Sequence, residues 1–350
     1  MSDTTLNATE SGMLADIRLH DIVVGVDGSD ESFAALRWAL NEASLTGQQV
    51  NAVFAWSHSW DMGSEPEDEE QWAEVRHEIA QRLRDWVSKA SQGMTINEDH
   101  VKLTSVKATG TSALLEIGKD AQQIVVGRRS LGRVARWFLG SLSESLAEAA
   151  QVPVTIVRIL DDEESSVQDA IANALTPSGN TVTYDLPGSP LPKNQRPIVV
   201  GVDGSETSRH ALRFAIDLAA LHHAPLQVMF CWQLKDLGVI EGYENAIAPI
   251  AVGQERAERI LDELLDSVEI PTAGIPDDFQ IESHAFHISA AKGLIAASRY
   301  ARHLVVGSRG LSGLDAHFLG SVSKQIVNFA DCTVTCLLYT SPSPRDSTSS

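Results

Sequence analysis

The sequence predicts an α/β fold built from two repeated, doubly wound domains, each with a five-stranded parallel sheet flanked by helices. The stretch IVVGVDGS occurs at 22–29 and again at 198–205, and the stretch at 124–141 is echoed at 304–321. Solenoid units recur about every 20–50 residues, so a repeat over this longer distance indicates two copies of a whole domain. Within each copy, apolar strand patterns alternate with helical ones, which is typical of a parallel sheet covered on both faces.

The first copy begins with a continuously apolar run at 21–26, the pattern of a strand buried on both faces. Ser29 or Asp30 is placed to cap the next helix, and Gly47 to end it. We interpret the acidic run 65–70 as the solvated start of a helix rather than a partner-binding feature. The other elements expected are a strand at 50–56, a helix from the acidic run to about Ser91, a strand at 101–108, a helix at 112–120, a strand at 124–126, a helix at 141–150 and a strand at 152–157.

The second copy repeats this order. We expect strands at 198–202, 226–232, 280–285 and 304–306, and helices at 205–221, 254–267, 290–301 and 321–329. The intervening segment is rich in acidic residues at first and then in Pro, Gly and Ser, which is typical of a linker with at most a short helix at 166–175. The expected organisation is a disordered tail at 1–20, a first domain at 21–158, a linker at 159–196, a second domain at 197–338 and a non-native tail at 336–350.

That last segment breaks the repeat. Residues 336–346 read CLLYTSPSPRD, which resembles the translation of a sequencing-library adapter. We therefore expect the natural sequence to end near Thr335, inside the last strand of the second copy. Leu337 and Leu338 would then fill strand positions only because they are apolar.

The composition and the charge of the sequence argue against several classes of function. A net charge of −20 argues against nucleic-acid binding, which needs clustered Lys and Arg. No apolar run reaches the about 18–20 residues of a membrane span, and the N-terminus lacks the pattern of a secretory signal. The three cysteines have neither metal-ligand spacing nor an even disulfide framework. These features predict a cytoplasmic protein without a membrane or nucleic-acid partner.

One group of residues in the second copy is suited to binding a ligand. Gly307 ends a buried strand, Gly310 follows in the loop, and Gly320 and Ser321 open a helix whose N–H groups and dipole favour phosphate. Ligands of doubly wound sheets bind at such strand ends. Arg309 can offer a charged fork, and the Ser321 and Ser323 hydroxyls can add hydrogen bonds. From spacing alone, the alternative that these glycines merely form tight turns stays open.

The pattern G-x2-G-x9-G-[ST], together with GVDGS at the start of the domain, resembles the ATP-binding universal stress proteins over 21–158 and 197–335. The resemblance implies an adenine-nucleotide alpha hydrolase-like domain that binds ATP or a related nucleotide, with or without Mg²⁺, and pairs with a second domain as an intramolecular pseudo-dimer. Asp203 would lie near the ribose and adenine, and the backbone at Cys231 would read the adenine edge. The implied nucleotide-binding residues are Asp203, Cys231, Gly307, Arg309, Gly310, Gly320, Ser321, Val322 and Ser323, with Asp27, Ala55, Gly127, Arg129, Gly140, Ser141 and Ser143 in the first copy.

The first copy departs from this pattern, because Ser130 stands where the second glycine belongs. If that position is left-handed, a serine there costs about 1–3 kcal/mol. About 1.4 kcal/mol is tenfold in affinity, so the first copy is expected to bind at least about tenfold more weakly. Arg128 is expected to oppose this effect as an extra cation beside the phosphates.

The histidines and tryptophans outside this pattern are expected to have mainly structural roles. His222 and His223 are expected at a helix C-terminus, and Trp56 and Trp232 are expected to pack rather than stack on adenine. His317 lies inside the loop, where contact with nucleotide stays open. No nucleophile–base pair or paired carboxylate recurs in both copies.

We therefore expect a non-catalytic nucleotide sensor or regulator in a stress response. The alternatives are a weak ATPase or phosphotransfer enzyme, and a structural pseudo-dimer without ligand. The sequence identifies neither the stress nor a protein partner, and it leaves a homodimer open.

Overall fold

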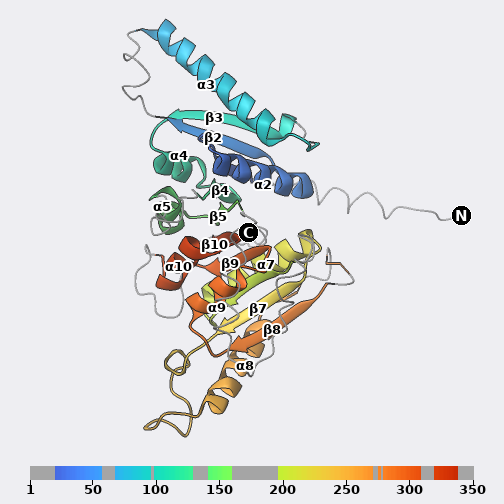
Figure 1. The fold of residues 1–350 in the computed structure, drawn as a ribbon, viewed down its shortest axis with the longest axis vertical. Coiled ribbons are helices and arrows are strands. Elements are labelled where there is room, and N and C mark those ends of the chain that lie inside the picture. Colours follow the sequence, from blue (N-terminus) through green and yellow to red (C-terminus); the bar gives the residue numbers. More distant parts are fainter. Residues whose placement is uncertain are drawn as a thin grey trace, which may run out of the picture.

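The computed structural model describes residues 20–56, 68–95, 98–128, 141–159, 196–270, 275–276, 279–308 and 319–337. We call the part before residue 160 the first half and the part after residue 195 the second half. Figure 1 shows the two halves one above the other along the long axis. The expected linker helix at 166–175, the N-terminal tail and residues beyond 337 lie outside the described residues.

All described strands join one ten-stranded sheet in the order β3-β2-β1-β4-β5-β10-β9-β6-β7-β8. Each half is parallel within itself and doubly wound, and the sheet order reverses beside β1 in the first half and β6 in the second. The fold class predicted from the sequence is therefore confirmed. The strands of the first half are β1 Ile22–Gly25, β2 Val50–Trp56, β3 Val101–Lys107, β4 Gln123–Gly127 and β5 Val154–Val157; those of the second are β6 Ile198–Val202, β7 Leu226–Cys231, β8 Ile281–Phe286, β9 His303–Gly307 and β10 Thr333–Leu337.

The helices start and stop at the residues that local chemistry favours. The Ser29 side chain accepts from the Ser32 backbone N–H to cap α2, and Gly47 ends that helix with φ 75°. Asp68 caps α3, which places the described part of the acidic run in an exposed first turn. The helices are α2 Asp30–Thr46, α3 Glu69–Ala90, α4 Gly110–Ile117, α5 Ser141–Ala149, α7 Glu206–Leu221, α8 Ile250–Asp266, α9 Ala290–Ala297 and α10 Ser321–Phe329, with short 3₁₀ turns at Glu98–His100 and Leu234–Asp236.

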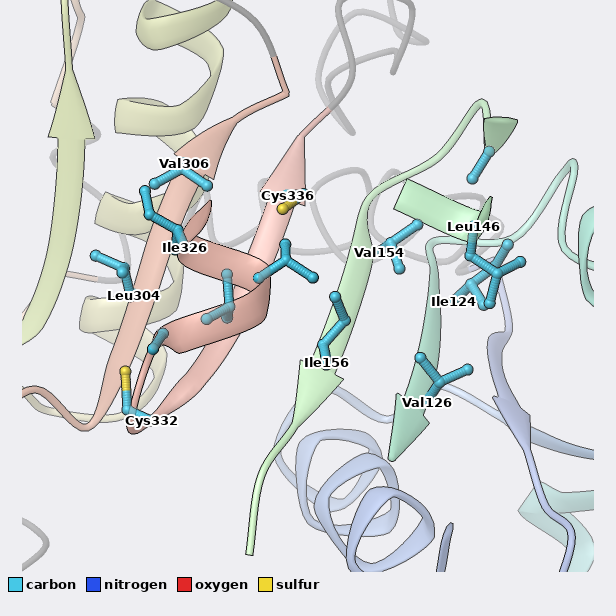
Figure 2. Packing of buried hydrophobic residues seen from close by; sticks show 14 of the residues in the cluster. Ile124, Val126, Leu146, Val154, Ile156, Leu304, Val306, Ile326, Cys332 and Cys336 are labelled. Atoms are coloured by element: carbon cyan, nitrogen blue, oxygen red, sulfur yellow. The ribbon is translucent and has the colours of Figure 1, made fainter. Parts of the chain in front are cut away.

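Alternating strand residues fill cores on the two faces of the sheet. Ile22 and Val24 pack with α2 and α3 on one face, and the equivalent residues of the second half pack with α7 and α8. On the other face, Val23 and its neighbours join α4, α5, α9 and α10 in a single core that runs through both halves. Figure 2 shows Val154 and Ile156 of β5 beside Cys336 of β10 in this shared core.

The halves meet where β5 pairs with β10 in antiparallel register, with Thr155 opposite Thr335. These two residues lie 180 positions apart and occupy equivalent places in the repeat, so an approximate twofold axis passes between them. Lys324 of α10 pairs with Glu144 of α5, its own equivalent across that axis. The pairing leaves neither β5 nor β10 as an unpaired sheet edge.

Two arginines of the first half hold the end of α10. The guanidinium of Arg128 donates to the Ala330 carbonyl at 2.9 Å and to the Asn328 carbonyl, and Arg158 donates to the Ala330 carbonyl at 2.6 Å. Arg158 also pairs with Asp331 at 2.5 Å. Positive charge at a helix C-terminus is stabilising, so these contacts both cap α10 and bind the halves together.

The expected truncation point falls inside β10. Cys336 and Leu337, the first two residues of the adapter-like segment, complete that strand and are buried. Both are apolar enough for a strand in the shared core, and Leu338 lies outside the described residues. Among the helices of the described part, none is long and apolar enough to cross a membrane.

Candidate functional site

The carboxyl ends of β6 and β9 lie side by side at the point where the sheet order of the second half reverses. Ligands of doubly wound sheets bind in the crevice beside such a point. Asp203 directly follows β6, Gly307 ends β9, and Cys231 ends the neighbouring strand β7. The structure thus brings these three sequence-predicted residues to one edge of the sheet.

The turn after β6 has a fixed geometry. An Asp203 carboxylate oxygen accepts from the Ser205 backbone N–H at 3.0 Å, and Gly204 has φ +83°. The first half repeats this turn, with Asp27 accepting from the Ser29 backbone N–H at 3.0 Å. A positive φ favours glycine, so the DGS sequence is required by the turn itself.

Helix α10 starts at the same edge as β9 ends. The Gly320 backbone N–H donates to the Ser308 carbonyl at 2.7 Å, which fixes the N-cap residue of the helix against the residue that follows β9. No side chain caps this helix, whereas Ser205 caps α7. Helix N-termini carry N–H groups without intrahelical partners and the positive end of the dipole. The start of α10 can therefore receive an anion.

The hydroxyl of Ser323, which the family resemblance implies is nucleotide-binding, makes a hydrogen bond within the fold. The residue is 4% exposed, and its hydroxyl donates to the Gly307 carbonyl at 2.7 Å. This hydrogen bond holds the strand end against the first turn of α10. Val322 of the same turn is half-buried and packs on the shared core, while Ser321 is exposed.

The side chain of Cys231 packs against helix α9. A Cβ added to Gly293 of α9 would lie 2.6 Å from the Cys231 sulfur. Burial raises the pKa of this thiol to about 12, so it stays protonated at neutral pH. The thiol packs against α9, although the residue as a whole is partly exposed.

In the first half, Ala55 lies one residue from the end of β2 and Gly127 ends β4. A Cβ on Gly127 would lie 2.2 Å from the Glu31 carbonyl oxygen, so α2 itself requires a glycine here. Ser143 is buried in α5, which begins at Ser141. Arg129, Ser130, Gly140, Arg309, Gly310 and His317 lie outside the described residues.

The expectation for Arg128 was wrong. Its guanidinium is hydrogen-bonded at the C-terminus of α10 in the other half and does not serve as a cation beside the phosphates. The sequence could not reveal this contact, because it depends on how β5 and β10 pair.

The tryptophans pack, as expected. Trp232 is fully buried, lies 4.4 Å from the His287 ring and donates its indole N–H to Gln254 at 3.1 Å. Trp56 is 9% exposed and lies against Trp72 at 6.0 Å.

Comparisons with known proteins agree with this fold. A model of the universal stress protein family matches residues 19–158 and 195–337. A universal stress protein of Mycolicibacterium smegmatis is 29% identical over 322 residues, which cover 90% of this chain and 96% of that protein. One from Mycobacterium tuberculosis is 28% identical over 315 residues, covering 89% and 94%.

Two solved structures are similar. A universal stress protein from Archaeoglobus fulgidus, 15% identical, covers 91% of this chain and 98% of its own with a TM-score of 0.56, which supports the fold. A universal stress protein solved in complex with cAMP is 26% identical and covers 42% of this chain and 98% of its own, with a TM-score of 0.31. Since the family model matches both halves, the chain belongs to the universal stress protein family and carries its domain twice.

Proposed function

We propose that this chain binds an adenine nucleotide, ATP in the first place, at the carboxyl edge of β6 and β9 and acts as a non-catalytic sensor or regulator in a stress response. The observation that carries the proposal is the start of α10. This helix begins without a side-chain cap beside Gly307, at the point where the sheet order reverses. Backbone N–H groups and a helix dipole at such a point favour phosphate.

Each residue has a role in this proposal. The phosphates lie against Gly307 and the first turn of α10, from Gly320 to Val322. Asp203 faces the ribose, and the Cys231 backbone faces the adenine. Ser323 positions the site through its bond to the Gly307 carbonyl rather than by touching phosphate. Arg309 and Gly310 complete the phosphate loop as the family resemblance implies.

The first half offers the equivalent residues Asp27, Ala55, Gly127, Arg129, Gly140, Ser141 and Ser143 as a second, weaker site. Support for the weaker affinity comes from Ser130 and from the position of Arg128, whose guanidinium is engaged with α10. Mg²⁺ would accompany ATP at either site. A cytoplasmic location is part of the proposal and is supported by the free thiols of Cys231 and Cys332, which suit a reducing compartment.

The test is to incubate the purified full chain with Mg·ATP and to follow bound nucleotide and released phosphate together. A sensor binds ATP and releases no phosphate beyond the buffer control. Steady phosphate release would favour the ATPase alternative, and absence of any bound nucleotide would favour the structural one. The same binding measurement with AMP and with cAMP shows which nucleotide the chain prefers.

A further inference from the structure

A chain of buried polar side chains crosses the junction between the halves on the α2 and α7 face of the sheet. His303 Nε2 lies 2.7 Å from the Thr335 hydroxyl, which lies 2.7 Å from the Thr155 hydroxyl, which donates to Gln123 Oε1 at 2.8 Å. These four side chains are at most 6% exposed. Gln123 and His303 are equivalent residues of the repeat, so the chain is symmetric except for its two ends.

The partners fix the direction of the hydrogen bonds. Each hydroxyl has a single proton to donate, and Gln123 Oε1 only accepts. Thr155 therefore donates to Gln123 and accepts from Thr335. Thr335 must then accept from His303, which carries its proton on Nε2.

A second group of titratable side chains lies beside this chain. Arg302 can only donate, so His222 Nδ1 accepts from its guanidinium at 2.8 Å, and the other nitrogen of the ring is Nε2. That nitrogen lies 2.6 Å from Glu42 of α2, with a geometry that falls short of a hydrogen bond and leaves an electrostatic contact. The His222 and Glu42 side chains are 6% and 4% exposed.

This group exists on one side of the twofold axis only. The residues equivalent to Glu42 and His222 are Leu218 and Thr46, and Gln122 is equivalent to Arg302. The buried histidines of the junction thus lie on one side of the axis only, and the ion pairs of Glu144 with Lys324 and of Asp331 with Arg158 are other titratable contacts of the junction.

His303 is enclosed by both halves. The Trp38 ring of α2 lies 5.8 Å from its imidazole, Thr335 of β10 holds its Nε2, and Ile198 of β6 is its strand neighbour. The charged and titratable groups around it are Glu42 on α2, His222 at the end of α7 and its neighbour Arg302. Burial first, and then His222 and Arg302, lower the pKa of His303 to about 3. The closed junction therefore holds this ring neutral.

We propose that this cluster makes the junction acid-sensitive, so that a fall in pH opens α2 and β5 of the first half away from α7 and β10 of the second. Opening removes Trp38 from beside His303 and Glu42 from beside His222, and it lets water reach the His303 ring. The hydrated ring takes up a proton with the ordinary histidine pKa, near 6.5. Because the open form binds one more proton, its equilibrium constant rises about tenfold for each pH unit below about 6.5, until the closed form also protonates near pH 3.

Hydrogen exchange of the full chain measures this opening directly. Peptides covering Val154–Val157 and Thr333–Leu337 report on the junction, and those covering Ile22–Gly25 and Ile198–Val202 report on the interior of each half. After correction for the intrinsic exchange rate, protection of the junction peptides is expected to fall about tenfold between pH 6 and pH 5, with the interior peptides unchanged. A uniform loss in all four peptides, or no loss, would overturn the proposal.

Two variants locate the effect. His303→Gln places the residue found at the Gln123 end of the hydrogen-bonded chain at its other end, where the amide N–H of the new side chain can donate to Thr335 as the imidazole does. This variant is expected to keep its junction protection at pH 5. His284→Gln removes a half-exposed histidine of β8 and is expected to behave as the wild type. A His303→Gln protein with the wild-type pH dependence contradicts the role of His303; should it misfold, the wild-type and His284→Gln profiles still decide whether the junction opens selectively.

Discussion

Thr155 and Thr335 face each other across the twofold axis, with their hydroxyl oxygens 2.7 Å apart and both side chains completely buried. This contact is the centre of the single ten-stranded sheet. Buried hydroxyls that lose a partner cost free energy, so the pair favours one register of β5 against β10. The two halves are consequently joined in a defined way rather than through a featureless apolar edge.

Replacing Thr155 or Thr335 with Val is expected to lower the free energy of unfolding by about 1–3 kcal/mol, because either change leaves buried polar partners unsatisfied. Thr155→Val, for example, leaves Gln123 Oε1 without its donor. Urea denaturation at pH 7.5 measures the effect. The double variant should cost less than the two single costs together, since each single change already breaks the link. Fully additive costs would show that the two hydroxyls act independently.

Arg128→Ser introduces the equivalent residue of the second half and removes the guanidinium from the end of α10. The expected loss is about 1.5–3 kcal/mol in the free energy of unfolding, the usual range for hydrogen bonds to a charged group. Nucleotide affinity should stay unchanged, because the side chain contacts the Ala330 carbonyl and not the phosphate edge. If the variant has normal stability but binds ATP more weakly, Arg128 contacts the phosphates as the sequence first suggested.

Gly28→Ala tests the turn after β1. Gly28 has φ +87°, and an added Cβ would lie 2.6 Å from the Trp86 ring of α3. Gly47 is the matched control, with φ +75° and no atom within 4 Å of an added Cβ. Gly47→Ala should cost about 1 kcal/mol from backbone strain alone, and Gly28→Ala about 1–3 kcal/mol more from overpacking. If the two variants have the same unfolding temperature, the Trp86 ring moves aside without cost.

The two proposed nucleotide sites should differ in affinity. Gly310→Ser gives the second half the residue of the first, and Ser130→Gly makes the reverse change. The strain estimate of about 1–3 kcal/mol predicts that Gly310→Ser weakens its site about tenfold or more and that Ser130→Gly strengthens the other equally. Calorimetric titration of the single variants compares them. Equal wild-type affinities, or a Ser130→Gly change without effect, would refute the asymmetry.

Much of the fold could be predicted because its signals are local. The strand 50–56 and the helix 321–329 have the predicted bounds, and the capping residues Ser29 and Gly47 stand where their chemistry places them. The helix predicted at 112–120 lies at Gly110–Ile117 instead, because the Thr109 side chain caps it and it begins two residues earlier than the apolar pattern suggests.

The contacts between the halves could not be predicted, because they follow from the pairing of β5 with β10. Nothing in the sequence near Arg128 indicates α10, and nothing near Glu42 indicates His222. In the candidate site, too, some residues could be predicted from the sequence and one contact could not. The glycines, Asp203 and the start of α10 were predicted from their motif, whereas the buried bond from Ser323 to the Gly307 carbonyl depends on the close approach of α10 to β9.

If nucleotide phosphate binds at the uncapped start of α10, Gly320→Asp should abolish most of that binding. Gly320 has φ −60° and ψ 151°, a conformation in which aspartate caps a helix. The new carboxylate should raise the free energy of unfolding by about 1 kcal/mol while occupying the phosphate position. Calorimetric titration with Mg·ATP should find binding in the wild type, a loss of about tenfold or more in Gly320→Asp, and little change at the stronger site in the matched variant Gly140→Asp. A Gly320→Asp protein that binds ATP as tightly as the wild type, or a wild type that binds none, would show that the start of α10 is not a phosphate site.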